Sequence, residues 1–219
     1  MIIAFTILCA VACAVLVYGE YRESNRLRFT AKPLASLAFI LVGVCGATRG
    51  DIHEFEMAVL AGLVLGAIGD VALLSPHGFL AGLGSFLLGH LAYAVAVGTY
   101  LPPRTWPHAT GIYALAPIIV GLGVLAWLWP KLGSLRIPVI AYVAVILAMV
   151  VAALALMRSD VAGMDLHRRE LFAVGAVLFF ASDLAVARDK FIAKGFVNRA
   201  WGLPVYYGGQ LLIAWSLAS

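Results

Sequence analysis

The chain has 219 residues, of which 63% are hydrophobic and 12% are charged, and its mean hydropathy is +1.01. A soluble domain of this size needs more polar surface, so the composition excludes a soluble enzyme, a disordered protein and a nucleic-acid-binding module. The chain has a net charge of +4, and its basic residues lie in short segments between apolar runs. Basic residues in such segments set topology and contact anionic headgroups. We therefore expect an all-α, polytopic membrane protein, with residues 1–219 forming a single integral membrane domain.

Apolar runs long enough to cross a bilayer, which takes about 20 residues per helix, follow one another along the chain. The predicted spans are 2–17, 33–47, 55–74, 79–100, 110–129, 137–157, 171–187 and 203–217. The first run lacks a basic start and a cleavage signal, so we expect it to be retained as a span. Pro33 is expected in the first turn of its helix, where its missing N–H costs nothing. The sequence thus predicts eight transmembrane helices with both termini on one side.

The loops on the two sides differ in basic residues. The odd-numbered loops contain ten (Arg22, Arg26, Arg28, Lys32, Lys131, Arg136, Arg188, Lys190, Lys194 and Arg199), and the even-numbered loops contain five (Arg49, Arg104, Arg158, Arg168 and Arg169). The positive-inside rule places the odd-numbered loops in the cytoplasm and both termini outside. In a bacterium the membrane would be the cell (inner) membrane.

Spans three and seven share a sequence pattern. Gly62-Leu63-Val64-Leu65 followed by Asp70 returns as Gly175-Ala176-Val177-Leu178 followed by Asp183. The two spans run in the same direction, which is consistent with a parallel repeat of four plus four spans. Chance similarity between apolar runs is the other interpretation.

Among the 11 acidic residues, we expect only Asp70 and Asp183 inside apolar spans, and we expect the others, including Glu56, in loops. An Asp at the centre of a membrane helix costs about 2.5–3.5 kcal/mol. For one such residue, solvation near the interface or a structural hydrogen bond is as good an explanation as a functional role. Two at matching depth favour a functional pair.

Four more polar side chains are expected at that depth: Lys32, which opens span two, and Tyr206, Tyr207 and Gln210, which open span eight. Successive helices run in opposite directions, so this agreement between spans is not imposed by the sequence order. It indicates a polar cavity that opens toward the cytoplasmic half of the bilayer.

His90 is the only one of five histidines expected inside a span, and Tyr93 follows it on the same helix face. An interhelical hydrogen bond explains His90 as well as a functional role does. A catalytic zinc ion needs about three converging ligands, and no HxxxH or HExxH spacing occurs, so no metal site is predicted. Ser182 has no GxSxG context and no assignable base. Gly62 and Gly66 form a GxxxG pattern, which is typical of close helix packing.

At these residues the chain resembles the YhhN-type lysoplasmalogenase family of multi-pass membrane proteins. The matching features are Lys32-Pro33-Leu34, Gly69-Asp70, Phe86 to Tyr93 with His90, Gly175-Ala176 with Phe179 and Ser182-Asp183, and Tyr206-Tyr207 with Gln210. They extend from span two to span eight. The resemblance implies eight spans and hydrolysis of the vinyl ether bond of a lysoplasmalogen, a lyso-ether phospholipid. The products would be a fatty aldehyde and glycerophosphoethanolamine or glycerophosphocholine.

This chemistry suits the two intramembrane carboxyl groups. A vinyl ether is cleaved by protonating a carbon to give an oxocarbenium ion, which needs a carboxylic acid that keeps its proton until then. We hypothesise that Asp70 and Asp183 form a catalytic pair, in which one donates the proton and the other stabilises the cation and activates water, as in glycosidases. The hypothesis requires a shared cavity, and it predicts that Asn at either position removes nearly all turnover.

The other polar side chains are expected to bind the substrate. Lys32 would bind the lipid phosphate, Tyr207, Gln210 and His90 would orient water or the glycerol hydroxyl, and Tyr93, Ser182 and Tyr206 would complete the site. No cofactor and no nucleic acid are expected, the partners are the substrate and membrane lipids, and the oligomeric state stays open. The main alternative is a proton-coupled small-molecule or lipid transporter that uses the same Asp pair. A lipid-binding regulator and a metal-dependent lipid hydrolase are weaker alternatives.

Overall fold

The computed structural model describes residues 1–218, and every regular element in that part is helical. Eight long helices form the body: α1 (Ile2–Tyr21), α2 (Asn25–Ala47), α3 (Glu54–Ala72), α4 (Phe79–Tyr100), α6 (Leu115–Leu128), α7 (Arg136–Arg158), α8 (Leu166–Phe191) and α9 (Phe196–Trp215), with a short α5 (Trp106–Thr110) before α6. The predicted all-α membrane architecture is confirmed. Within the described residues, seven segments are long and apolar enough to cross a membrane, and α9 is not one of them.

The composition of α9 reflects what it contributes to the interior. Its polar side chains Asn198, Tyr206, Tyr207 and Gln210 are all buried in the bundle. They lower the mean hydropathy of the helix without meeting lipid, because neighbouring helices cover them. α9 thus lies lengthwise among the other helices and contacts α8, α2 and α1.

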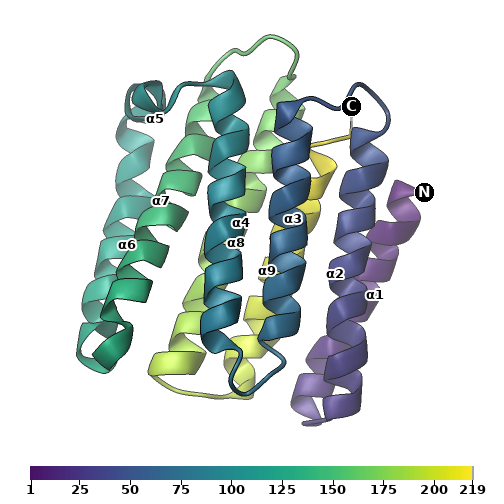
Figure 1. Ribbon diagram of the computed structural model, residues 1–219, viewed down its shortest axis with the longest axis vertical. Helices are drawn as coiled ribbons and strands as arrows, with labels where there is room; N and C mark the ends of the chain where they lie inside the picture. Colours follow the sequence, from purple (N-terminus) through teal and green to yellow (C-terminus); the bar gives the residue numbers. More distant parts are fainter. Residues whose placement is uncertain (219) are drawn as a thin grey trace.

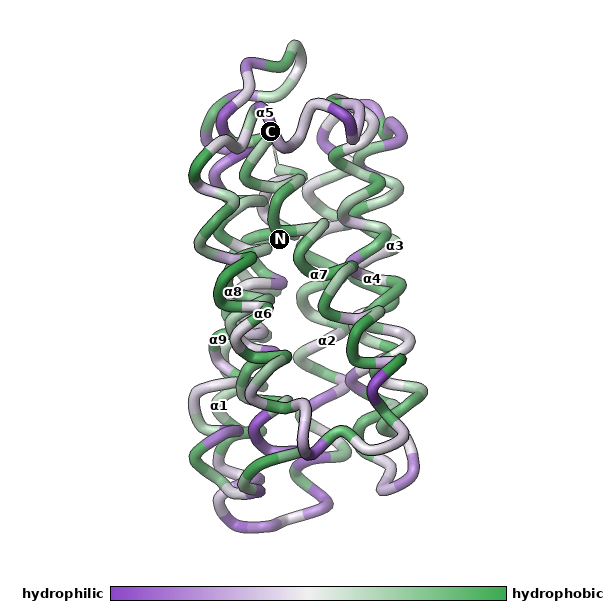
Figure 2. Tube along the Cα trace, turned by 90° about the vertical axis from the view of Figure 1, so that its left-hand side faces the viewer, coloured by the Kyte–Doolittle hydropathy of each residue, from purple (hydrophilic) through white to green (hydrophobic). Residues whose placement is uncertain are grey.

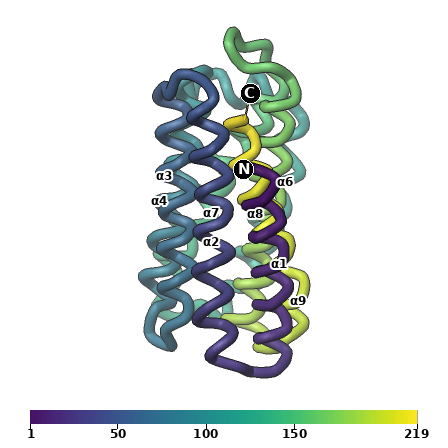
Figure 3. Tube along the Cα trace, turned by 90° about the vertical axis from the view of Figure 1, so that its right-hand side faces the viewer, coloured from purple at the N-terminus to yellow at the C-terminus, as the bar shows by residue number. Residues whose placement is uncertain are grey.

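The helices form two layers of four (Figures 1 and 2). One layer runs α2, α3, α4, α7, and the other runs α1, α9, α8, α6. Figure 3 shows α1 at one edge, where it packs against both α2 and α9. Hydrophilic residues gather at the two ends of the bundle and hydrophobic ones along the helix middles (Figure 2). Many large apolar side chains, such as those of Ile7, Val64 and Leu88, are exposed on the outside, as expected of a lipid-facing surface.

The termini and the even-numbered loops lie toward one end of the bundle, and the odd-numbered loops lie at the other (Figure 1). This agrees with the predicted placement of both termini on one side. Asp70 precedes the end of α3 by two residues, and Asp183 precedes the end of α8 by eight. Both carboxyl groups therefore belong to the half of the bundle next to the odd-numbered loops.

Several predicted boundaries were wrong. α9 begins at Phe196, seven residues before the predicted start of its span. α2 begins at Asn25, and the Ser24 side chain caps it by accepting from the Leu27 N–H, so Pro33 lies inside the helix and not in its first turn. α8 begins at Leu166 after the N-cap Asp165, so residues 166–170 are helical and not part of a loop. The fifth span is broken between α5 and α6 at Gly111, whose φ of +56° lies in the left-handed region that favours glycine.

The prediction that Glu56 lies in a loop was also wrong. Glu56 is in the first turn of α3 and is only 6% exposed. Its Oε1 lies 3.0 Å from Nη2 of Arg168 on α8, and the Nε of Arg168 donates to the Ser216 carbonyl at 2.7 Å. This ion pair ties three helices together at the end of the bundle opposite to Asp70. An acid at the start of a helix is favourable for the helix dipole as well.

Candidate active site

The polar side chains of the bundle interior meet between the two layers. One layer supplies Lys32 and Ser36 from α2, Asp70 from α3, His90 and Tyr93 from α4, and Tyr142 from α7; the other supplies Asp183 from α8 and Tyr206, Tyr207 and Gln210 from α9. Polar groups inside a membrane protein are costly unless they find partners within it. The layer interface provides those partners, in two separate groups.

The first group surrounds the carboxylate of Asp70, which is 2% exposed. Its Oδ2 accepts hydrogen bonds from the hydroxyls of Ser36 at 2.7 Å, Tyr206 at 2.9 Å and Tyr207 at 3.5 Å. Its Oδ1 lies 3.3 Å from the ammonium of Lys32. These four donors and the matching positive charge accommodate an ionised carboxylate at a buried position.

Hydrogen bonds extend this group across the bundle. The Gln210 side-chain amide donates to the Tyr206 hydroxyl at 3.3 Å, and the Tyr93 hydroxyl donates to the Gln210 oxygen at 2.7 Å. The chain of contacts therefore links Asp70 on α3 with Tyr93 on α4 through two side chains of α9. We call the set Lys32, Ser36, Asp70, Tyr93, Tyr206, Tyr207 and Gln210 the Asp70 cluster.

Glycines of α3 make room for this cluster. A Cβ atom at Gly62 would overlap the ring of Tyr93, and one at Gly66 would overlap the side-chain amide of Gln210. The GxxxG pattern thus serves close packing, as predicted, and the groups packed against it are side chains of the cluster.

The second group surrounds Asp183. The Tyr142 hydroxyl donates to Oδ2 of Asp183 at 2.8 Å. Nε2 of His90 lies 3.8 Å from the same oxygen, which is beyond a hydrogen bond. Within residues 1–218, neither ring nitrogen of His90 has a hydrogen-bond partner, so the interhelical hydrogen bond considered for it is not formed.

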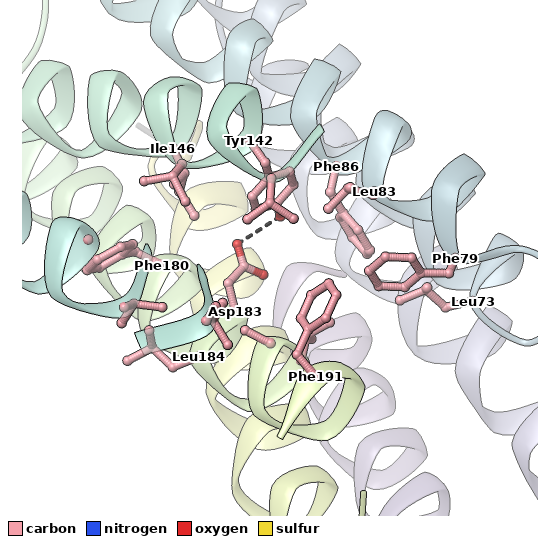
Figure 4. Close-up of a pocket in the computed structure, with 17 residues that line it drawn as sticks. Leu73, Phe79, Leu83, Phe86, Tyr142, Ile146, Phe180, Asp183, Leu184 and Phe191 are labelled. Atoms are coloured by element: carbon pink, nitrogen blue, oxygen red, sulfur yellow. Dashed lines mark hydrogen bonds between the residues drawn. The ribbon is translucent and has the colours of Figure 1, made fainter. Parts of the chain in front are cut away.

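Asp183 also lines an apolar groove between α4, α6, α7 and α8. Figure 4 shows its carboxyl group turned toward Tyr142, with the rings of Phe79, Phe86 and Phe191 nearby. Apart from the Asp183 carboxyl and the Tyr142 hydroxyl, the side chains that line the groove are apolar. A hydrocarbon chain suits such a lining, and the carboxyl group would lie beside it.

Phe86 stands between the two groups. It lines the groove, and its ring packs edge-on against Tyr206 at 5.8 Å and Phe179 at 5.9 Å between centroids. Tyr206 in turn donates to Asp70. In the part of the chain that the structure describes, no hydrogen bond or ion pair joins Asp70 to Asp183, and Asp70 does not line the groove. The two carboxyl groups therefore lie in different surroundings.

The sequence identified most of these residues but not all. Ser182 is buried, but its hydroxyl donates to the Phe179 carbonyl of its own helix at 2.7 Å and reaches neither group. Ser36 and Tyr142 were missed, although each left a signal. Ser36 follows Lys32 by four residues and so shares its helix face, and Tyr142 is the only side chain with a polar atom in the predicted span 137–157.

Comparisons with known proteins point to one family. A family model described as the YhhN family matches residues 27–217. The chain is 33% identical over 181 residues to a protein of Mycobacterium bovis named lysoplasmalogenase, and this match covers 79% of the chain. It is 37% identical over 168 residues to lysoplasmalogenase TMEM86A of Bos taurus, which covers 75% of the chain. An Escherichia coli membrane protein, YhhN, is 27% identical over 206 residues, or 92% of each chain.

The matched part spans 63% of the length of the mycobacterial relative and 66% of the bovine one. No solved structure matches the chain at a significant level. The names of these relatives give no support to the transporter that the two intramembrane carboxyl groups also suggested.

Proposed function

This chain belongs to the YhhN family, and from that premise we propose that it is a membrane hydrolase that cleaves the vinyl ether bond of lysoplasmalogen. The relatives named lysoplasmalogenase support this substrate class. The observation that carries the assignment of the site is the carboxyl group of Asp183 in the wall of an apolar groove. The products are a fatty aldehyde and a glycerophospho-base.

Asp183 is the proton donor in this proposal. Its surroundings are apolar, and burying an uncompensated charge there is costly, so the carboxyl group favours its neutral form. The alkenyl chain occupies the groove with its vinyl ether beside Asp183. The proton passes to the vinyl carbon that does not carry the oxygen, and the electron pair of the double bond forms the new C–H bond. The positive charge left on the ether carbon and oxygen then faces the ionised carboxylate.

Asp70 has a different role. Its carboxylate is paired with Lys32 behind Phe86, so we assign it to holding the Asp70 cluster in place and not to contact with the substrate. Lys32, predicted to bind the lipid phosphate, belongs to the same cluster, because its ammonium is already paired. The cluster supports Tyr206, whose ring packs against Phe86 and Phe179 and so helps to shape the groove wall.

The basic odd-numbered loops are the basis for the proposed orientation. They face the cytoplasm, both termini face outward, and the lyso-lipid enters from the cytoplasmic leaflet. In a bacterium this membrane is the cell membrane. The groove opens in the half of the bundle next to those loops, where a single-chain lipid of that leaflet would reach it.

Aldehyde release from a 1-alkenyl lysophospholipid by the purified protein in detergent tests the proposal. We expect Asp183→Asn to lower turnover by about 10²–10⁴-fold, the range for the loss of a general acid. Ser182→Ala is the matched control, because it removes a buried hydroxyl of the adjacent residue that bonds only to its own helix. A wild-type protein that releases no aldehyde refutes the function, and full activity in Asp183→Asn refutes the proton donor.

A further inference from the structure

His90 is a buried polar residue whose hydrogen-bonding groups are not used within the protein. Its side chain is fully buried, and neither ring nitrogen has a partner among residues 1–218. Leaving a buried polar group without a partner is costly, so such a group in a native protein calls for an explanation.

Packing fixes the ring in place. The Phe179 ring lies 4.4 Å from the imidazole centroid, and the Tyr142 ring packs edge-on at 5.3 Å. Tyr142 also donates to Asp183, so the same side chain positions both His90 and the carboxyl group. The orientation of the imidazole is therefore determined by its neighbours and not by a hydrogen bond of its own.

Nε2 of His90 faces Asp183 without bonding to it. Nε2 of His90 and Oδ2 of Asp183 are 3.8 Å apart, and both ring nitrogens of His90 are closed to solvent. A water oxygen about 2.8 Å from each atom, an ordinary hydrogen-bond length, therefore bridges them only when the two side chains move apart to admit it. The groove lining is apolar apart from Asp183 and Tyr142, and His90 is not part of that lining.

We propose that His90 and Asp183 together hold the hydrolytic water, and that Nε2 of His90 is the base that takes its proton. This inference rests on the proposed vinyl ether hydrolysis and completes it. Geometry gives His90 this role, since it is the one side chain with a free basic nitrogen near the proton donor in the described part of the chain.

The steps balance without any further reactant. Asp183 gives its proton to the vinyl carbon, and the water oxygen then bonds to the cationic ether carbon while His90 takes a water proton. The resulting hemiacetal breaks its bond to the glycerol oxygen, which receives the proton held by His90. The hemiacetal hydroxyl returns its proton to the Asp183 carboxylate as the carbonyl forms. The enzyme regains its starting protonation, and aldehyde and alcohol leave.

Deuterium exchange separates this role of His90 from that of Asp183. Without an activated water, the cation formed by Asp183 has to return a proton, so in D2O the vinyl carbon of unreacted substrate exchanges hydrogen for deuterium. We expect His90→Ala to lower aldehyde release by about 100-fold or more while exchange appears in the recovered lysolipid. Asp183→Asn should lose both release and exchange.

His90→Gln fills nearly the same space without a basic nitrogen, and we expect the same division between release and exchange as in His90→Ala. Unfolding temperatures identify any variant that fails to fold. Near-wild-type release in both His90 variants overturns the proposal, as does loss of release without exchange in the folded glutamine variant. If the wild type itself neither releases aldehyde nor exchanges deuterium, the proposed function fails, and the assignment of His90 fails with it.

Discussion

Replacing Asp70 tests the role assigned to it behind Phe86. Asp70→Asn leaves the ammonium of Lys32, whose side chain is 11% exposed, without its counter-charge. Removing one partner of a buried ion pair costs about 3–5 kcal/mol, because the remaining charge stays buried. This is a large share of the roughly 5–15 kcal/mol that stabilises a typical protein. We therefore expect a much lower unfolding temperature and little folded protein.

A second substitution should recover the fold. Lys32→Met combined with Asp70→Asn removes both charges, and replacing a buried pair by uncharged groups of similar volume is close to neutral or even stabilising. The Asn side-chain oxygen still accepts from Ser36 and Tyr206, whose hydroxyls bond to the carboxylate at 2.7 and 2.9 Å. The double variant should regain most of the lost stability.

The assay measures the unfolding temperature in detergent and aldehyde release per folded molecule. If Asp70 only positions its cluster, the double variant turns over within about tenfold of the wild type, equivalent to about 1.4 kcal/mol. Asp183→Asn provides the comparison for loss of a group that touches the substrate. A stable double variant that is as inactive as Asp183→Asn would refute the positioning role and place Asp70 in direct contact with the reacting groups.

Three further predictions concern the groove, the glycine face and the topology. Ala187 lines the groove one turn after Asp183, so Ala187→Phe should raise KM or lower turnover at least tenfold. The control, Val177→Phe on the exposed face of α8, should change neither. Equal effects of the two substitutions would refute a substrate site in the groove. Gly66→Ala should destabilise by about 1–3 kcal/mol because its Cβ overlaps a side chain, whereas Gly84→Ala, with nothing within 4 Å, should not. In a cysteine-free background, Gly195→Cys should react with an impermeant thiol reagent only after the cells are opened, and labelling of intact cells would reverse the topology.

Hydropathy alone identifies every long helix of the described residues except α9, because a span that meets lipid must satisfy its backbone hydrogen bonds internally and present an apolar surface. The boundaries failed where helices continue beyond the membrane, as α2 does before Pro33 and α8 does after residue 187. Glu56 was misplaced for another reason, because it lies at the very start of the predicted span 55–74. A charged residue at a helix end is typical of a loop, and only the contact with Arg168 shows that it is buried.

The scarcity of charge in the spans also singled out Asp70 and Asp183, but it did not reveal how their surroundings differ. Those surroundings come from helices far away in the sequence. Lys32 is 38 residues before Asp70, and Tyr142 is 41 residues before Asp183. Hydroxyl side chains are common in membrane helices, so Ser36 and Tyr142 gain their meaning only from the layer interface.

The contacts of the two carboxyl groups favour the repeat interpretation of the sequence. Asp70 on α3 meets side chains of the helix that precedes it, α2, and Asp183 on α8 meets one of the helix that precedes it, α7. Each also approaches a side chain of the last helix of the other half: Tyr206 of α9 bonds to Asp70, and His90 of α4 lies beside Asp183. The two halves thus place their fourth helices in corresponding positions.

The two halves place their carboxyl groups in corresponding positions, but different neighbouring side chains give the two groups different chemistry. In one half the preceding helix supplies an ammonium and a hydroxyl, which compensate a charge. In the other half it supplies a single phenol and leaves the rest of the surroundings apolar. Environments that separate the behaviour of two acids are how enzymes assign them different roles. A lysine on the preceding helix tests whether the neighbours make the difference. Val139→Lys, one turn before Tyr142 on α7, should give Asp183 a cation and abolish turnover without unfolding the bundle. A Val139→Met variant of similar length controls for filling the groove, and equal activity in the two would refute the idea that an uncharged Asp183 is what the reaction requires.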